Sequence, residues 1–251
     1  MRILLSNDDG IDSVGMAALV EALAPEHTLV VAAPATEQSA KAHAITVRTN
    51  IEVEPGEHFA AAGIEAWKIH GTPADCVKLY LEAMARPETM PELVISGINK
   101  GANLGSDVLY SGTVGAAIEG YMHGLPAIAV SLDIDSVLPY TQVAALFRDY
   151  LPALFAEAAR PFLFNINYPR FLLDGVPNYV FTSVGRRDYL NAFQRIEING
   201  RVYYHMAGEI YDGPNDEVTD VYAANHGYIA VSPLRIDLTD VDFLDEKLRY
   251  R

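Results

Sequence analysis

The chain has 251 residues, half of them hydrophobic, and a formal net charge of −15. This length allows one large domain with a substantial core, and the acidic balance argues against a nucleic-acid polymer as partner because such partners are bound by basic surfaces. The single cysteine excludes an intrachain disulfide bond, and no stretch of about 18 apolar residues predicts a membrane span. The N-terminus lacks a signal-peptide pattern, so we expect a soluble, cytoplasmic protein without membrane contact.

The first half of the chain alternates short apolar runs with segments of helical period. The apolar runs, which predict buried strands, lie at 3–5, 29–33, 93–95, 127–130 and 162–164. Helical spacing is found between them, at 16–23, 73–83, 114–123 and 143–158. Two further short strands are predicted outside this repeat, at 45–47 and 51–53. Such βα alternation predicts a parallel sheet with helices on both faces.

The second half has a different pattern. Residues from about 179 to 231 are rich in aromatic and β-branched side chains and in Gly, Pro and Asn, with little helical period. This composition predicts β-hairpins that form an arm, followed by a short charged helix over 241–251. We therefore expect a single domain over 1–251, with an α/β core at about 1–175 and a β-rich arm and C-terminal extension at about 176–251.

Two adjacent carboxylates, Asp8 and Asp9, follow the first predicted strand directly. Ligands of open α/β sheets bind outside the carboxyl ends of the strands. Neighbouring carboxylates repel each other unless a cation or protons lie between them, and such oxygen ligands favour magnesium or manganese. An ordinary Asx turn before the next helix is the alternative, but a cap needs only one aspartate.

Two more loops follow predicted strands and carry oxygen-bearing side chains: Gln38-Ser39, and Asn99 with Asn103. If the sheet is doubly wound, these loops converge with the two aspartates at a topological switch point. Carboxylates, a hydroxyl and an amide carbonyl would then form an oxygen-only cation site completed by water. Ser39 and Asn99 alone are weak signals, because Ser and Asn are common in loops.

A glycine-rich stretch leads into the predicted helix at 114–123 through Ser111, Gly112 and Thr113. A helix N-terminus of this kind offers N–H groups and hydroxyls to a phosphate. Simple capping of the helix by Ser111 or Thr113 is the alternative. The spacing matches neither a Walker A loop nor a dinucleotide-binding fingerprint.

Other notable residues have structural interpretations. His43 and His70 lie near predicted strand ends, where a lone histidine is more often structural than catalytic. Asp75 is expected to complete a helix cap with Thr72, and Cys76 is expected to lie in the core.

Six segments, taken in order, resemble the SurE family of stationary-phase survival proteins. They are RILLSNDDGIDSVG, EQSAKAHAIT, HGTPADCVKL, SGINKGANLGSDVLYSGTVGAAIEG, NINYP and GYIAVSPL, and they extend from the N-terminus to Leu234. The resemblance implies a Rossmann-like three-layer α/β/α core with a mostly parallel sheet and a C-terminal β-hairpin arm exchanged between subunits of a homodimer or tetramer. It also implies a 5′-nucleotidase: a metal-dependent phosphomonoesterase acting on nucleoside 5′- and 3′-monophosphates and, in some members, on short polyphosphate.

The resemblance also implies roles for individual residues. Asp8 and Asp9 would be catalytic, and one Mg²⁺ or Mn²⁺ per subunit would be held by Asp8, Asp9, Ser39 and Asn99. The phosphate would be bound by Asn103, Ser111, Gly112 and Thr113. The sequence leaves open whether Asp8 or a water molecule attacks phosphorus. It also leaves the leaving-group acid unassigned, with His43 as a candidate.

The chain departs from the family pattern at Ala40, Lys41 and Ala44, where many members carry small or hydroxyl residues. A lysine near a phosphate site can alter substrate preference. Haloacid-dehalogenase-type phosphatases also place aspartates after the first strand, but their Asp-x-Asp pattern does not fit Asp8-Asp9-Gly10. A non-catalytic nucleotide sensor is the alternative of a different class. Two carboxylates facing an anionic ligand argue against it, because binding alone does not require them.

Overall fold

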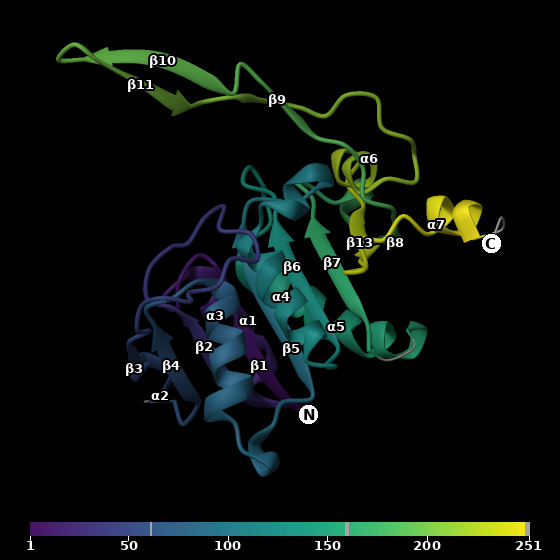
Figure 1. The fold of residues 1–251 in the computed structure, drawn as a ribbon. Coiled ribbons are helices and arrows are strands. Elements are labelled where there is room, and N and C mark those ends of the chain that lie inside the picture. Colours follow the sequence, from purple (N-terminus) through teal and green to yellow (C-terminus); the bar gives the residue numbers. More distant parts are fainter. Residues whose placement is uncertain (61, 159–160, 249–251) are drawn as a thin grey trace.

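The computed structural model describes residues 1–60, 62–158 and 161–248. These residues form a nine-stranded sheet in the order β3-β4-β2-β1-β5-β6-β7-β13-β8 (Figure 1). The strands are β1 Arg2–Ser6, β2 Thr28–Pro34, β3 Val53–Pro55, β4 Glu65–Ile69, β5 Leu93–Lys100, β6 Ala127–Leu132, β7 Leu163–Tyr168, β8 Tyr179–Phe181 and β13 Ile229–Pro233. Neighbours are parallel except for β3 with β4 and β13 with β7, so the predicted mostly parallel sheet is confirmed.

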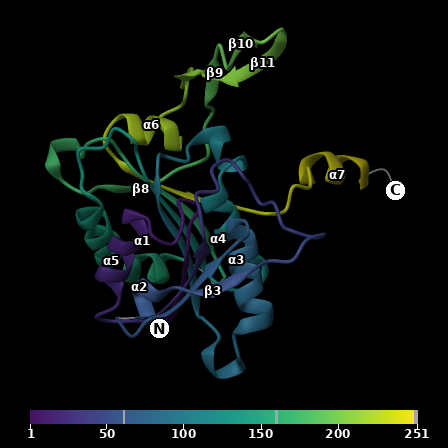
Figure 2. The same cartoon turned by 90° about the vertical axis from the view of Figure 1, so that its left-hand side faces the viewer.

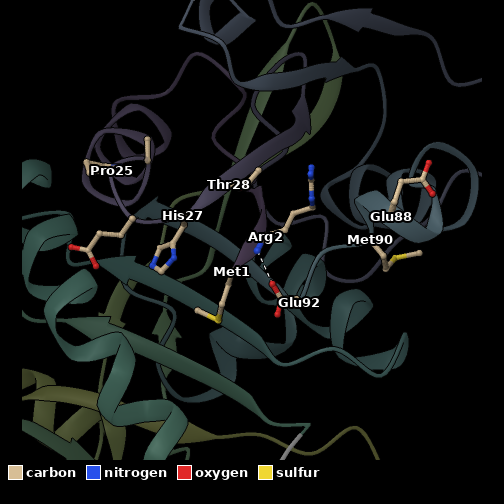
Figure 3. A pocket seen from close by; sticks show the side chains of 10 residues that line it. Met1, Arg2, Pro25, His27, Thr28, Glu88, Met90 and Glu92 are labelled. Carbon is tan, nitrogen blue, oxygen red and sulfur yellow. Dashed lines mark hydrogen bonds between the residues drawn. The ribbon is translucent and has the colours of Figure 1, made fainter.

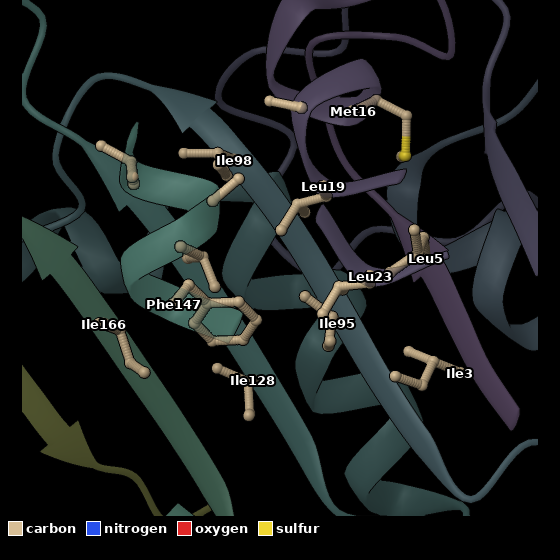
Figure 4. Packing of buried hydrophobic residues seen from close by; sticks show 14 of the residues in the cluster. Ile3, Leu5, Met16, Leu19, Leu23, Ile95, Ile98, Ile128, Phe147 and Ile166 are labelled. Carbon is tan, nitrogen blue, oxygen red and sulfur yellow. The ribbon is translucent and has the colours of Figure 1, made fainter. Parts of the chain in front are cut away.

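Helices cover both faces of this sheet, because successive side chains of a strand point to opposite faces. On one face, α1 (Val14–Leu23) and α5 (Tyr140–Glu157) pack on Ile3, Leu5, Ile95 and Ile128 (Figure 4). On the other face, α3 (Pro73–Leu79) and α4 (Gly112–Met122) pack on Leu4, Val94 and their neighbours. The predicted three-layer α/β/α core is therefore confirmed.

The start of α3 shows how local sequence determines a helix boundary. The Thr72 hydroxyl accepts from the Asp75 N–H at 3.1 Å, and the Asp75 carboxylate accepts from the Thr72 N–H at 2.9 Å. This is the predicted capping box, with Pro73 in the first turn. Cys76 is fully buried, as predicted.

The predicted strand at 45–47 is wrong. The Thr46 N–H donates to Asp75 Oδ1 at 2.8 Å and the Thr46 hydroxyl donates to Asp75 Oδ2 at 2.6 Å. This backbone is therefore bound to the cap of α3 and not to a strand. The strand predicted at 51–53 lies two residues later, as β3, and pairs antiparallel with β4. A four-residue helix, α2 (Glu57–Ala60), separates these two strands.

The arm leaves the molecule at the carboxyl end of the sheet and projects away from it (Figures 1 and 2). It contains β9 (Asp188–Leu190), β10 (Phe193–Ile198), β11 (Arg201–Met206) and β12 (Glu209–Tyr211). β10 and β11 form an antiparallel hairpin that turns at Asn199-Gly200, both with positive φ as a type I′ turn requires.

The rest of the second half returns to the core. β8 and β13 extend the central sheet. α6 (Asp220–Asn225), capped by Thr219, lies in the region predicted to have little helix. The predicted tail helix is confirmed as α7 (Val241–Leu248), and 249–251 lie outside the described residues. Within the described ranges, no helix has the length and hydropathy needed to span a membrane.

Candidate active site

The candidate site lies at the carboxyl ends of β1 and β5. β1 pairs with β2 on one side and with β5 on the other. The chain passes from β1 to β2, and only later returns to the opposite side of β1 as β5. This reversal of strand order creates the switch point at which ligands bind in open α/β sheets. Asp8 and Asp9 follow β1, and Asn99 lies near the end of β5.

Asp8 is in direct contact with the turn that begins α4. Its side chain is buried, with 6% exposure, and its Oδ1 accepts a hydrogen bond from the Thr113 hydroxyl. A Cβ atom at Gly112 would lie 3.1 Å from Asp8 Oδ2 and 3.0 Å from Pro73 Cγ, so the approach needs glycine. The structure thus brings Asp8 into contact with Gly112 and Thr113, which lie more than a hundred positions later in the chain.

The surroundings of Asp8 and Asp9 disfavour the charged forms of both carboxyl groups. Burial and, to a smaller extent, the charge of Asp9 together raise the pKa of Asp8 to about 6, against the lowering effect of its hydrogen bond with Thr113. Burial also raises the pKa of Asp9, as does the charge of Glu37. Within the described ranges, neither carboxylate is in an ion pair with a basic side chain. This arrangement fits a bound cation, which would relieve both effects.

Asn99 and Lys100 connect β5 with Asp9. The Lys100 N–H donates to Asp9 Oδ2 at 2.9 Å. The Asn99 amide nitrogen donates to the Gly101 carbonyl oxygen at 2.8 Å, which turns the amide so that its oxygen is the atom that can bind a cation.

Ser39 is the predicted ligand least constrained by the structure. The Gln38 N–H donates to the Asp8 carbonyl oxygen at 2.7 Å and brings the loop to the site. The Ser39 side chain, however, is exposed, and its hydroxyl donates to Glu37 Oε1 at 2.6 Å. Glu37 is not among the site residues predicted from the sequence, although it lies only two residues before Ser39.

Asn103 is held by buried polar side chains of two strands. Its N–H donates to Asn167 Oδ1 at 2.7 Å, its side-chain nitrogen donates to Ser131 Oγ at 2.8 Å, and its carbonyl oxygen accepts from Asn165 Nδ2 at 2.9 Å. The two β7 asparagines belong to the NINYP segment, to which the sequence assigned no role. Asparagines in an otherwise apolar buried strand were the available signal, because buried polar side chains need partners.

The first turn of α4 combines capping with free donors. The Ser111 hydroxyl accepts from the Val114 N–H at 3.1 Å, so the capping interpretation of Ser111 is confirmed. The Thr113 hydroxyl instead points to Asp8. The helix N-terminus therefore lies against the aspartates, where its N–H groups and dipole favour an anion.

A second polar cluster lies one to three turns along α4. Glu119 Oε2 is 2.6 Å from His43 Nε2, and Glu119 Oε1 is 3.3 Å from Lys78 Nζ. Glu82, Glu119 and His123 have ligand atoms close enough together to hold a metal ion. Lys78 already supplies positive charge there, since its Nζ is also 2.6 Å from Glu82.

Three cavities differ in their relation to these residues. One of about 440 Å³ is lined by Asp9, Glu37, Lys100 and Tyr140, and one of about 810 Å³ adjoins His43 and Ser111. The third, of about 630 Å³, lies at the amino ends of β1 and β2, around Met1, Arg2, His27 and Thr28 (Figure 3). The third cavity is therefore separated from the aspartates by the length of the strands, since they lie at the carboxyl end of β1.

Comparison with known proteins agrees with this geometry. The profile of the family described as "Survival protein SurE" matches residues 3–191. The chain belongs to the SurE family. A protein of Desulforudis audaxviator named 5′-nucleotidase SurE is 46% identical over 253 residues, covering 98% of this chain and 95% of the relative. A protein of the same name from Pelotomaculum thermopropionicum is 44% identical over 247 residues, covering 98% and 93%.

The crystal structure of the SurE protein from Aquifex aeolicus has the same fold. Its TM-score to this chain is 0.83, at 32% sequence identity and 98% coverage of both chains. The resemblance inferred from the NDDG, SGIN and SGT segments is therefore confirmed, as is the fold that it implied.

Proposed function

We propose that this SurE-family chain is a metal-dependent 5′-nucleotidase that hydrolyses nucleoside 5′-monophosphates to nucleoside and phosphate. The observation that carries the proposal is the contact of buried Asp8 with the Gly112-Thr113 turn, which joins an acidic pair to an anion-binding helix N-terminus. Relatives at 44–46% identity are named 5′-nucleotidase SurE. The proposal extends to nucleoside 3′-monophosphates and short polyphosphate as substrates.

The residues that would hold a divalent ion are Asp8, Asp9, Ser39 and Asn99. Mg²⁺ or Mn²⁺ bound there would supply positive charge beside the phosphoryl oxygens and would help to ionise a water molecule. The raised pKa values of the two carboxyl groups support this set, because a cation favours their charged forms. Ser39 would have to exchange its hydrogen bond with Glu37 for the ion.

The phosphate would be bound by Asn103, Ser111, Gly112 and Thr113. The N–H groups of the first α4 turn would stabilise negative charge on the phosphoryl oxygens in the transition state. Asn103 is fixed by Ser131, Asn165 and Asn167, so its position costs little reorganisation during the reaction. The nucleophile is either the Asp8 carboxylate, which would give a phospho-aspartyl intermediate, or water, which would give none.

The arm is proposed to be exchanged between subunits of a homodimer or tetramer. Its hairpin exposes large apolar side chains, among them Phe193, Tyr204 and Met206. Exposed apolar surface on a projecting two-stranded hairpin indicates a protein interface. The division at about residue 175 remains a prediction, as does the cytoplasmic location.

Phosphate release from a panel of nucleoside 5′- and 3′-monophosphates and short polyphosphate tests the proposal. The assay is run with Mg²⁺, Mn²⁺ or chelator. Metal-dependent release that is absent in Asp8→Asn supports the function and ranks the substrates. Tight nucleotide binding without release under any condition would favour the non-catalytic sensor.

A further inference from the structure

We propose that His43, held by Glu119, protonates the leaving oxygen of the substrate, and that the leaving nucleoside occupies the adjoining cleft. This inference rests on the proposed function. We call the space the α4 cleft; its volume is about 810 Å³, and its lining includes His43, Ser111, Val108, Ile118, Val184 and Leu238.

His43 is packed against the first turns of α4. A Cβ atom at Gly115 would lie 3.1 Å from His43 Cα and would collide with the Ala42 carbonyl oxygen, so this loop lies directly on the helix. The Ala42 N–H donates to the Tyr110 carbonyl oxygen at 2.9 Å, next to Ser111. Gly115 is one helical turn beyond Ser111, so the His43 backbone lies one turn from the proposed phosphate site, and its imidazole reaches Glu119 one turn further along α4.

Glu119 orients the imidazole ring. Its carboxylate is 4% exposed and its Oε2 lies 2.6 Å from His43 Nε2, while the His43 side chain is 30% exposed. With Nε2 directed at Glu119, Nδ1 is the ring nitrogen available to a ligand. The Glu119 carboxylate also balances the positive charge of a protonated His43, as the aspartate of a catalytic triad does for its histidine.

The charge on Glu119 is maintained by its surroundings. Burial alone would raise the pKa of Glu119, but the hydrogen bonds and charges of His43 and Lys78 outweigh burial and lower it. Lys78 Nζ lies 3.3 Å from Glu119 Oε1, and His123 Nδ1 lies 3.5 Å from the same oxygen. Glu119 is therefore ionised at neutral pH and serves as a positioning residue for His43.

The α4 cleft adjoins both the proposed acid and the proposed phosphate site. Ser111, at the phosphate turn, and His43 line the same cavity, whose remaining walls are mostly apolar. An apolar cavity beside a phosphate site suits a nucleobase and ribose, whose faces are apolar and whose edges are polar. Ser106 and Arg235 are polar residues in its lining.

Protonation by His43 accompanies the cleavage of the bond between phosphorus and the ribose oxygen. The new bond to phosphorus is formed either by water, which gives up one proton to solvent, or by the Asp8 carboxylate, whose acyl phosphate is then hydrolysed by a water molecule. The bond between phosphorus and the ribose oxygen breaks, with its electron pair remaining on that oxygen. The proton on His43 Nδ1 moves to the same oxygen, so that a neutral hydroxyl leaves, and His43 then takes a proton from water.

The test compares two leaving groups. A nucleoside hydroxyl needs a proton to leave, whereas p-nitrophenolate is stable as an anion and does not. For His43→Asn we expect kcat on a nucleoside monophosphate to fall by about 10²- to 10⁴-fold, with p-nitrophenyl phosphate hydrolysis changed by less than about threefold. For Glu119→Gln we expect a smaller loss of kcat on the nucleoside monophosphate, about 10- to 100-fold, as for other partners that orient a functional histidine. Hydrolysis of p-nitrophenyl phosphate should again change little.

His70→Asn is the matched control, since His70 Nε2 lies 2.5 Å from Glu54 in an exposed pair outside the α4 cleft. This substitution should leave the rates of hydrolysis of both substrates unchanged. Equal losses on both substrates in His43→Asn, or no loss on the nucleotide, would overturn the inference. Failure of the proposed function is distinguishable, because it would appear as no release from either substrate by the wild-type protein.

Discussion

Every residue of β6 and β7 is buried, whereas every residue of β10 and β11 is exposed. All four strands contain β-branched or aromatic residues, which favour extended backbone in either setting. The central strands gain stability from helices packed on both faces, while none of the described residues forms a layer over the arm hairpin. A two-stranded hairpin is marginally stable alone. The comparison indicates that local strand preference shapes the arm, and that the arm needs another surface to be stabilised.

The sheet and the arm also differ in the burial of their polar side chains. At the carboxyl edge of the sheet, Asp8, Asn165 and Asn167 are buried, which costs stability unless partners compensate. The polar side chains of β10 and β11 remain in water and carry no such cost. Asn165 and Asn167 are compensated by their hydrogen bonds with Asn103, whereas burial destabilises the charged form of Asp8.

The largest effect is expected for Asp8→Asn. Nucleotidase activity should fall by at least about 10³-fold, because the substitution removes one of two charged ligands of the proposed ion. In chelator, the melting temperature should rise, since an amide ends the repulsion from Asp9 and the burial of charge. The exposed Asp12→Asn is the control and should change neither quantity. Unchanged activity in Asp8→Asn would contradict the proposed site.

Truncating one phenylalanine in the core and one in the arm compares their contributions to the free energy of unfolding. Phe147→Ala, in the α5 face of the core (Figure 4), should lower the free energy of unfolding by about 3–5 kcal/mol. Phe193→Ala, in the arm, should change it by less than about 0.5 kcal/mol at dilutions where the chain is monomeric. Denaturant titration measures both. A large loss for Phe193→Ala in the monomer would show that the arm belongs to the folding unit.

The base of the arm should be more sensitive than its tip. Arg187 is 7% exposed, and its Nε donates to Asp212 Oδ1 at 2.7 Å. Arg187→Met removes the cation from Asp212, which keeps its hydrogen bond from Asn225, at a cost of about 1–3 kcal/mol in the local opening free energy. Protease cleavage of the arm should therefore accelerate. Arg186→Met, which breaks only an exposed pair with Asp188, should cost less than about 1 kcal/mol. Equal cleavage rates for the two variants would show that the Arg187–Asp212 pair does not hold the base of the arm.

The smallest effect on the fold is expected from shortening the tail. Deleting residues beyond Asp237 should weaken assembly more than it damages the proposed metal site. α7 lies away from the sheet (Figure 2), so its loss should leave the core packing unchanged. Size-exclusion chromatography with light scattering measures the mass, and phosphate release measures the site. An unchanged mass would exclude a role of the tail in subunit exchange.

Local sequence patterns determined much of this protein. The alternation of apolar runs and helical period predicted the parallel sheet. Thr72-Pro73 with Asp75 predicted the start of α3, and the apolar run before Asp8-Asp9 predicted β1. These predictions succeed because strand period, helix period and capping depend on residues only a few positions apart.

Tertiary structure decided the contacts between distant segments. It paired Asp8 with Thr113 and His43 with Glu119, surrounded Asn103 with side chains of β6 and β7, and bound Thr46 to the cap of α3 in place of a strand. These contacts depend on the order of strands in the sheet and on which face each helix covers. Neither property leaves a periodic signal in the residues themselves, because it arises only when separate segments pack together.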